Sequence, residues 1–357
     1  MNPGETERVL SRRRFLQRCA VGICLLPACA RPAAAADQPA RPGELLYNAK
    51  AREAVQKALA YLASRQNEDG SFGTGTYSRN AAVIGLCGMA FLADGDVPGR
   101  GRYGRHVARC LDFLLAHTAE NGFVSAAEGA SRGPMYDHGF ATLFLSEVYG
   151  MAPTKDVRDP LSRAVRLIID TQNSEGGWRY EPRRHEADIS VTVCQVMALR
   201  AAHNTGMFVP NTVIDRAVEY VKKCQNADGG FMYQAGQPPM ESLFPRSAAA
   251  IVALYSAGIY EGEEIRKGLD YLMRNPPRRN VQGEQSYYMY GHYYAVQAMW
   301  HAGGKFWQTW YPAIRDSLLA EQRADGSWFD TISPEYGTAM ATLVQHMPSN
   351  YLPIFQR

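Results

Sequence analysis

The sequence has few cysteines, no metal-ligand spacing and no large excess of one charge, and each of these absences excludes a class of protein. Its seven cysteines form no Cys-x-x-Cys or comparable pattern, which disfavours a structural zinc site. Its 38 basic and 35 acidic residues leave a formal net charge of only +3. Such a balance gives no electrostatic reason to expect nucleic acid as a partner.

The first 36 residues are predicted to be a leader and not part of the fold. The motif Ser-Arg-Arg-Arg-Phe-Leu at residues 11–16 precedes a short apolar run, residues 20–30, and an alanine-rich site, residues 33–36. This order is typical of a twin-arginine signal peptide, and the run is too short for the roughly 20 residues of a membrane helix. We therefore expect export to the periplasm or cell envelope, with membrane attachment only if Cys29 is lipidated.

Removal of this leader leaves 32 basic and 33 acidic residues and four cysteines, Cys87, Cys110, Cys194 and Cys224. These cysteines lie in apolar helical patterns, where free cysteine commonly behaves as a small buried residue. Residues 37–49 are expected to form a proline-rich linker, and residues 348–357 a C-terminal tail that packs on the fold.

A seven-residue motif, Gln-Asn-Ala-Asp-Gly-Gly-Phe at residues 225–231, recurs along the chain. Clear copies begin at Gln66, Gln172 and Gln322, and a copy without the glutamine covers residues 118–123. Gln172 and Gln225 are 53 residues apart, and Gln66 and Gln172 are 106 apart. A period near 50 indicates stacked supersecondary units. With a sixth turn assigned to residues 282–287, residues 50–347 hold six units.

Two kinds of helix alternate around these motifs. The helix before each motif has apolar residues in steps of three and four, such as Val55, Leu59 and Leu62, so only one face is buried. The helix after each motif, such as residues 81–93 or 189–202, is apolar or small nearly all round. Six buried helices inside six amphipathic ones form an all-α fold, an α/α toroid of six hairpins.

The motif resembles the repeat of squalene cyclases and protein prenyltransferase β-subunits, and the resemblance covers nearly all of residues 50–347. It implies that the glutamine, glycine and aromatic residues are structural: the amide joins one helix end to the next, and glycine permits the tight turn. We therefore expect Gln66, Gln172, Gln225, Gln322, Trp178 and Trp328 to contribute to stability. The resemblance does not identify an activity.

Candidate site residues lie at the rim, which is the set of first turns of the inner helices together with the loops before them. Expected catalytic residues are His138, Asp188, His292 and Tyr290, and expected ligand-binding residues are Tyr136, Asp137, Arg79, Arg246 and Tyr336. Below this rim we expect a cavity lined by apolar and small residues, as in pockets for largely apolar or flat ligands.

The catalytic motifs of the two resembled families are incomplete. The cyclase motif Asp-x-Asp-Asp does not occur in the sequence. The prenyltransferase zinc site uses Asp-x-Cys and a histidine, whereas Asp188 is followed two residues later by Ser190. One alternative is a different zinc site formed by His138, Asp188 and His292, which begin three inner helices. The other is that each of the three caps a helix or forms a structural hydrogen bond.

Three functions are compatible with these features. The first is a toroid that binds, and can transform, a small-molecule, isoprenoid or glycan ligand at its rim. The second is a polysaccharide lyase or hydrolase, for which tyrosine, histidine and arginine at the rim supply suitable residue types. The third is a non-catalytic scaffold of the cell envelope.

Overall fold

The computed structural model describes residues 46–126, 130–152, 155–236, 241–278 and 287–356. All of these belong to one compact unit, Arg41–Arg357. The predicted leader, most of the linker and most of the sixth turn, residues 282–286, lie outside the described residues. The described part contains twelve α-helices and two short 3-10 helices, and it has no strand of more than an isolated bridge.

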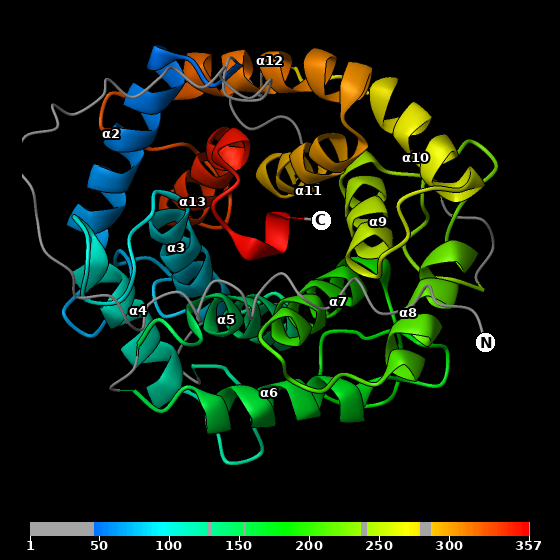
Figure 1. The fold of residues 1–357 in the computed structure, drawn as a ribbon, viewed down its shortest axis with the longest axis horizontal. Helices are drawn as coiled ribbons and strands as arrows, with labels where there is room; N and C mark the ends of the chain where they lie inside the picture. The colour runs from blue at the N-terminus through cyan, green and yellow to red at the C-terminus, as the bar shows by residue number, and fades with distance from the viewer. Residues whose placement is uncertain (1–45, 127–129, 153–154, 237–240, 279–286, 357) are drawn as a thin grey trace, which may run out of the picture. The chain divides into compact units, whose positions relative to one another are not determined.

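The helices form two concentric rings (Figure 1). The inner ring consists of α3 (Ala81–Ala93), α5 (Pro134–Val148), α7 (Ile189–Asn204), α9 (Phe244–Ser256), α11 (Tyr288–Ala302) and α13 (Pro334–His346). The outer ring consists of α2 (Ala49–Arg65), α4 (Gly104–Ala116), α6 (Arg158–Thr171), α8 (Asn211–Lys223), α10 (Glu263–Met273) and α12 (Gly304–Glu321). Each inner helix contacts the next, and α13 contacts α3, so the inner ring is closed. The predicted α/α toroid is confirmed.

The two rings differ in burial as the apolar patterns predict. Every residue of α3 is buried, because this helix packs against neighbours on all sides. In α2 only one face is buried, by Val55, Leu59 and Leu62 among others. An apolar stripe therefore attaches each outer helix to the inner ring. None of the helices in the described ranges is long and apolar enough to cross a membrane.

The glutamine of each motif joins consecutive outer helices. Gln172 Nε2 donates to the Gly176 carbonyl in its own turn and to the Val213 carbonyl at the start of α8, both at 2.8 Å. Gln322 does the same across the seam between the last and first units, donating to the Ala54 carbonyl of α2 at 2.8 Å. Gln66 and Gln225 make equivalent bonds to His106 and Glu264. The structural role predicted for these glutamines is confirmed.

The first glycine of each motif allows the turn to contact the next outer helix. Gly176 has φ +100°, and a Cβ placed on it would lie 2.2 Å from the carbonyl oxygen of Arg216 in α8. Gly326 has φ +90°, and its Cβ would lie 2.6 Å from the Lys57 carbonyl of α2. Only glycine combines this backbone conformation with so close an approach.

The two motif tryptophans fill the space between the rings. Trp178 and Trp328 are fully buried, and each indole N–H donates to the outer helix that precedes it, to the carbonyls of Ile168 and Leu318. This pairing satisfies the polar atom of a large buried ring. Their predicted structural role is also confirmed, and all four cysteines of the described residues are buried and free, as expected.

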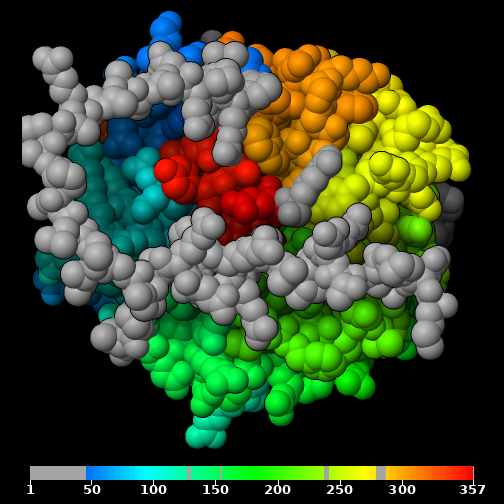
Figure 2. All heavy atoms as spheres, in the orientation of Figure 1, coloured from blue at the N-terminus to red at the C-terminus, as the bar shows by residue number. Residues whose placement is uncertain are grey.

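The tail leaves α13 and turns into the inner ring. It contains no α-helix but has two 3-10 turns, η3 (Met347–Ser349) and η4 (Pro353–Phe355). Leu352, Ile354 and Phe355 are buried, and η4 contacts α7. Figure 1 shows the C-terminus inside the ring, and in Figure 2 the red atoms of α13 and the tail lie in the middle of the same face.

One buried carboxyl group faces the tail. Glu147, near the end of α5, is only 5% exposed, and its carboxyl accepts a hydrogen bond from the backbone N–H of Ile354. Its Oε2 has no hydrogen-bond partner among the described residues. Burial raises the pKa of Glu147 to about 8, because a charge is costly in an apolar surrounding. The group is therefore expected to be protonated at neutral pH.

We predict that Gly176→Ala destabilises the protein more than Gly206→Ala. Both glycines have positive φ, but a Cβ on Gly206 would meet no atom within 4 Å. Gly206→Ala should therefore lower the free energy of unfolding by about 1 kcal/mol, the cost of placing alanine in a left-handed backbone conformation. Gly176→Ala should lose roughly 3 kcal/mol, since the turn must also move away from α8. Urea unfolding of the two variants measures the difference, and equal losses would contradict the role of the close contact.

We further predict that Glu147 makes stability fall with rising pH. Its pKa is higher in the folded protein, about 8, than the ordinary 4.5, so folding takes up a proton between these values. The free energy of unfolding should decrease from about pH 4.5 to pH 8, by at most about 5 kcal/mol. Glu147→Gln cannot titrate and should lack this decrease. Unfolding of both proteins across the range tests it, and parallel pH curves would show that Glu147 is not responsible.

Candidate functional site

Three inner helices present half-buried residues with hydroxyl groups in the described part of their first turns, where most neighbouring residues are fully buried. These are Tyr136 of α5, Ser190 of α7 and Tyr290 of α11. Tyr290 Oη donates to the Ser190 carbonyl at 3.3 Å. One turn further along the same two helices, Tyr294 Oη and Cys194 Sγ lie 3.3 Å apart. Side chains of α7 and α11 therefore meet across the interior of the ring.

Two tyrosines from the loops before α7 and α9 complete this group. The hydroxyls of Tyr180 and Tyr233 are hydrogen-bonded to each other. The ring of Tyr180 lies 6.2 Å from that of Tyr136 between centroids, and the rings of Tyr290 and Tyr294 are 4.8 Å apart. We call Tyr136, Tyr180, Tyr233, Tyr290 and Tyr294 the tyrosine cluster. It brings together five residues from four consecutive repeats.

Asp188 is a buried acid beside this cluster. It caps the N-terminus of α7, where Oδ1 accepts a hydrogen bond from the Val191 N–H at 2.9 Å. It is fully buried, and Oδ2 has no hydrogen-bond partner of normal geometry among the described residues, although the Tyr233 hydroxyl lies near the carboxylate. Burial raises the pKa of Asp188 to about 6, and bonds to backbone N–H groups and the charge of Arg179 oppose this rise.

The tyrosines around Asp188 are held in their neutral form. Burial and then the charge of Asp188 raise the pKa of Tyr136 well above its usual range. Burial also raises the pKa of Tyr290 well above that range, with Cys194 as the next cause. At neutral pH the site therefore offers phenolic O–H groups, aromatic faces and one carboxylate that titrates near pH 6. Such a set can hold an apolar or flat molecule and accept one hydrogen bond from it.

The interior below the rim differs from the expected cavity of apolar and small residues. Tyr293 and Tyr294 of α11 are buried there with ring centroids 4.9 Å apart, and Tyr293 also packs against Phe140 of α5. Large aromatic side chains thus fill much of the ring. We therefore expect a ligand to bind near the rim, where Tyr136 and Tyr290 remain partly exposed.

The predicted role of His138 is not compatible with its contacts. It is fully buried, Nδ1 accepts from the backbone N–H of Val124 at 3.1 Å, and Nε2 lies 3.1 Å from the Ala164 carbonyl of α6. Both nitrogens are therefore used, and burial lowers the pKa of the ring to about 4. The histidine joins a turn to the next outer helix, in the unit whose motif has lost its glutamine.

Three hydroxyl residues occupy the same repeat position as His138. Thr192 of α7, Ser247 of α9 and Thr338 of α13 each accept the backbone N–H of their motif's aromatic residue. His292 is at the equivalent place in α11. It is buried against Tyr288, Phe244 and Trp310, and burial lowers its pKa to about 3. Its position indicates a structural residue as well.

The zinc site expected from His138, Asp188 and His292 is not formed. Within the described ranges, no three histidine, cysteine, aspartate or glutamate residues are close enough to hold a metal ion. The physical reason is that the two histidines face the space between the rings, where the turns need hydrogen bonds, whereas Asp188 borders the tyrosine cluster.

The predicted ligand-binding residues divide between the interior and the outside. Tyr336 of α13 is buried, and burial together with the charges of Asp330 and Cys194 raises its pKa, so it lies by the cluster. Arg246 stacks its guanidinium 5.8 Å from the ring centroid of Tyr233. By contrast, Asp137 binds the Asn80 side chain between α5 and α3, and Arg79 pairs with Asp69 on the outer side. These last two residues make contacts within the fold.

Five residues of the site were not among the expected site residues: Ser190, Cys194, Tyr180, Tyr233 and Tyr294. Ser190 and Cys194 are four residues apart on α7, and Tyr290 and Tyr294 have the same spacing on α11. This i, i+4 spacing places each pair on one helix face. These two pairs could have indicated the site from the sequence, because the inner helices of nearby repeats present equivalent faces to the interior of the ring.

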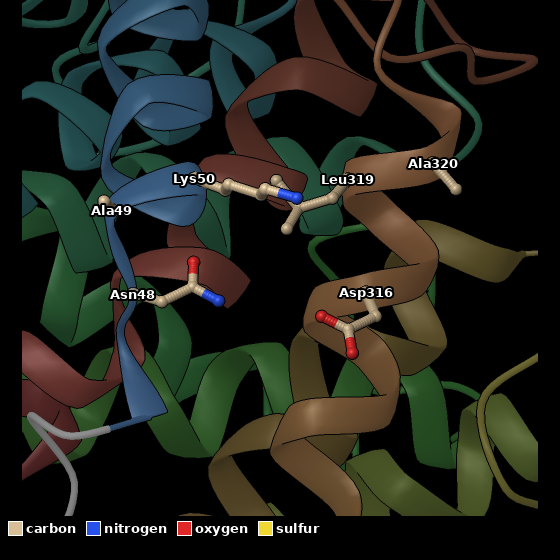
Figure 3. Close-up of a pocket in the computed structure, with 6 residues that line it drawn as sticks. All are labelled: Asn48, Ala49, Lys50, Asp316, Leu319 and Ala320. Atoms are coloured by element: carbon tan, nitrogen blue, oxygen red, sulfur yellow. The ribbon is translucent and has the colours of Figure 1, made fainter.

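A surface groove elsewhere has no comparable chemistry. It lies on the outer ring between the start of α2 and α12, with a volume of about 690 Å³, and Figure 3 shows the six residues that line it. Asn48 there is occupied as the N-cap of α2, and Asp316 pairs with Arg315. The groove therefore marks the seam of the outer ring and is not the candidate site.

Two family models match different parts of the chain. The model of the squalene-hopene cyclase C-terminal domain matches residues 135–291, and that of the prenyltransferase alpha-alpha toroid domain matches residues 18–124. The first match contains Asp188 and four residues of the tyrosine cluster together with Tyr290's partner Ser190.

Curated relatives match over a limited length. A squalene–hopene cyclase of Zymomonas mobilis is 24% identical over 165 residues, which are 43% of this chain and 24% of that protein. A drimenyl diphosphate synthase of Streptomyces showdoensis is 28% identical over 148 residues, 39% of this chain and 25% of that protein. The chain thus matches about a quarter of the length of each relative.

Solved structures share the fold over nearly their whole length. The type II terpene cyclase MstE from Scytonema, in complex with merosterolic acid A, has a TM-score of 0.62 at 12% identity and covers 87% of this chain and 99% of its own. An alpha-1,6-mannanase of Salegentibacter has a TM-score of 0.59 at 8% identity, covering 84% and 99%. These structural matches show the α/α-toroid fold alone. The two family models, together with the repeat motifs, place the chain in the prenyltransferase and squalene cyclase repeat superfamily.

Proposed function

We propose that the protein binds a small, largely apolar ligand at the tyrosine cluster, with the free oxygen of Asp188 as its polar contact. The observation that carries this proposal is the buried Oδ2 of Asp188, unpartnered among the described residues, beside partly exposed tyrosine rings. A buried acceptor without a hydrogen bond costs about 1–3 kcal/mol. A ligand hydroxyl that donates to this oxygen would recover that cost.

The apolar part of the ligand would lie against aromatic faces. Tyr136 and Tyr290 come from helices on different sides of the ring interior and leave part of their surface exposed. The names of the relatives concern isoprenoid compounds: squalene, a drimenyl diphosphate, and a geranylgeranyl dihydroxybenzoate named as the substrate in another MstE structure. These names support an isoprenoid alcohol as the first ligand to test.

We propose that the protein binds this ligand and does not cyclise it. The Asp-x-Asp-Asp acid motif is absent from the sequence. Asp188 serves as an N-cap, and in this proposal its second oxygen accepts a hydrogen bond from the ligand and does not donate a proton to it. A glycan substrate is less favoured, since the mannanase and an alpha-amylase of Clostridium perfringens share only the fold, at 8% and 11% identity.

We expect Asp188→Asn to weaken binding of geranylgeraniol about 10-fold at pH 7.5, because the amide replaces the free acceptor by a donor. Asparagine is also a good N-cap, so the helix start is preserved. The difference from the parent should shrink below about pH 6, where the raised pKa of Asp188 leaves the parent's carboxyl protonated. Titration calorimetry in detergent at both pH values provides the measurement.

Tyr220→Phe is a matched control, because Tyr220 is fully buried in outer helix α8 and does not belong to the tyrosine cluster. It should bind like the parent, whereas Tyr290→Ala should bind at least 10-fold more weakly. Parent-like affinity in both Asp188→Asn and Tyr290→Ala would contradict the proposed site.

We also propose that the protein is exported through the twin-arginine pathway to the periplasm or cell envelope. The leader motif at residues 11–16 supports this proposal. Replacing Arg12 and Arg13 together by lysine should abolish export in a bacterial host, as followed by cell fractionation. Unchanged export of that variant, or export in a host without the translocase, would contradict it.

A further inference from the structure

The tail is an element of the interior that no repeat requires. Six inner and six outer helices already close the ring, as the contact between α13 and α3 shows. Residues 347–356 then continue past the last helix and return to the middle of the ring (Figure 1). Leu352, Ile354 and Phe355 are 3%, 6% and 3% exposed, whereas Tyr351 is 64% exposed. The segment thus inserts one apolar side into the ring and leaves the other in solvent.

The polar attachment of this segment is slight. The backbone N–H of Ile354 donates to the carboxyl of Glu147, and Gln356 Nε2 donates to the Asn350 carbonyl within the tail itself. One carboxyl oxygen of Glu147 has no hydrogen-bond partner among the described residues, and the hydroxyl of Tyr293 has none either. Burial raises the pKa of Tyr293, and the charges of Cys194 and Glu147 add to this rise. These buried polar atoms would be hydrated if the tail moved away.

Ring contacts connect the tail to the tyrosine cluster. Phe355 packs edge-on against Tyr293, with centroids 6.4 Å apart. Tyr293 packs against Tyr294 at 4.9 Å, and Tyr294 against Tyr290 at 4.8 Å. Cys194 lies on this path, since its sulfur contacts the Tyr294 hydroxyl. The tail therefore borders the same aromatic interior whose other end forms the candidate site.

We propose that residues 352–355 act as a displaceable plug that closes the interior of the toroid opposite the rim and restricts access to the tyrosine cluster from that side. The part about ligand access rests on the function proposed above. The closure itself does not, because it concerns the exposure of interior atoms whether or not a ligand binds.

The thiol of Cys194 reports this closure directly. Cys194 is 2% exposed and faces the interior, while Cys110 in α4 and Cys224 at the end of α8 belong to the outer ring and are fully buried. The experiment treats the full chain and a chain ending at Asn350 with N-ethylmaleimide, and follows each cysteine by peptide mass spectrometry. We expect Cys194 to react at least about 10-fold faster in the shortened chain, with the rates of Cys110 and Cys224 unchanged.

Point variants keep the proposal testable if the shortened chain folds poorly. Phe355→Ala should also accelerate Cys194 modification, because it removes the side chain that fills the ring. Tyr351→Ala is the matched control from the same segment, and its exposed side chain predicts an unchanged rate. Glu147→Gln retains an acceptor for the Ile354 N–H and should keep the parent's rate at pH 7.

Two results would overturn the plug. One is an unchanged Cys194 rate in both the shortened chain and Phe355→Ala. The other is an equal acceleration at all cysteines, which would show that the tail only stabilises the whole fold. Geranylgeraniol binding to the same proteins separates the two proposals: selective exposure of Cys194 without binding in any protein supports the plug and contradicts the proposed function. Parent-like binding together with an unchanged rate of Cys194 modification supports the proposed function and contradicts the plug.

Discussion

The close contact between each repeat turn and the backbone of the next outer helix is the constraint on which the remaining structure depends. Glycine at a positive φ brings the turn against a carbonyl, and the motif glutamine bonds a neighbouring carbonyl of the same helix. The contact recurs at the seam, where Gln322 and Gly326 meet α2. A chain that repeats one rotation in this way closes on itself, and all first turns of the inner helices then converge at one rim.

This geometry separates structural from functional positions within each inner helix. One face looks toward the outer ring and must satisfy the N–H of the turn, a task performed by Thr192, Ser247, Thr338 or His138. The opposite face looks into the ring and is free to vary between repeats. Tyrosines, Ser190 and Cys194 occupy it, so the candidate site is a product of differences between repeats, whereas stability comes from what the repeats share.

Much of the fold could be predicted from the sequence, because motif spacing and apolar periodicity are local. The predicted inner helix at residues 81–93 coincides with α3. The sequence predicted a site at the rim, and four of the predicted residues lie close together there: Asp188, Tyr136, Tyr290 and Tyr336. The predicted zinc site was wrong because the first turn of an inner helix presents some residues to the interior of the ring and others to the outer ring. Residue type alone does not distinguish the two faces. Aligning His138 with Thr192 as one repeat position would have identified it as structural.

We propose that ligands bind inside the ring at the tyrosine cluster and not at the histidines or the outer groove. A crystal structure of the protein with bound geranylgeraniol tests it most directly. We expect ligand density between Tyr136 and Tyr290, with the ligand hydroxyl within hydrogen-bond distance of Asp188 Oδ2. Density beside His138 or His292, or in the groove between α2 and α12 with an empty rim, would contradict it.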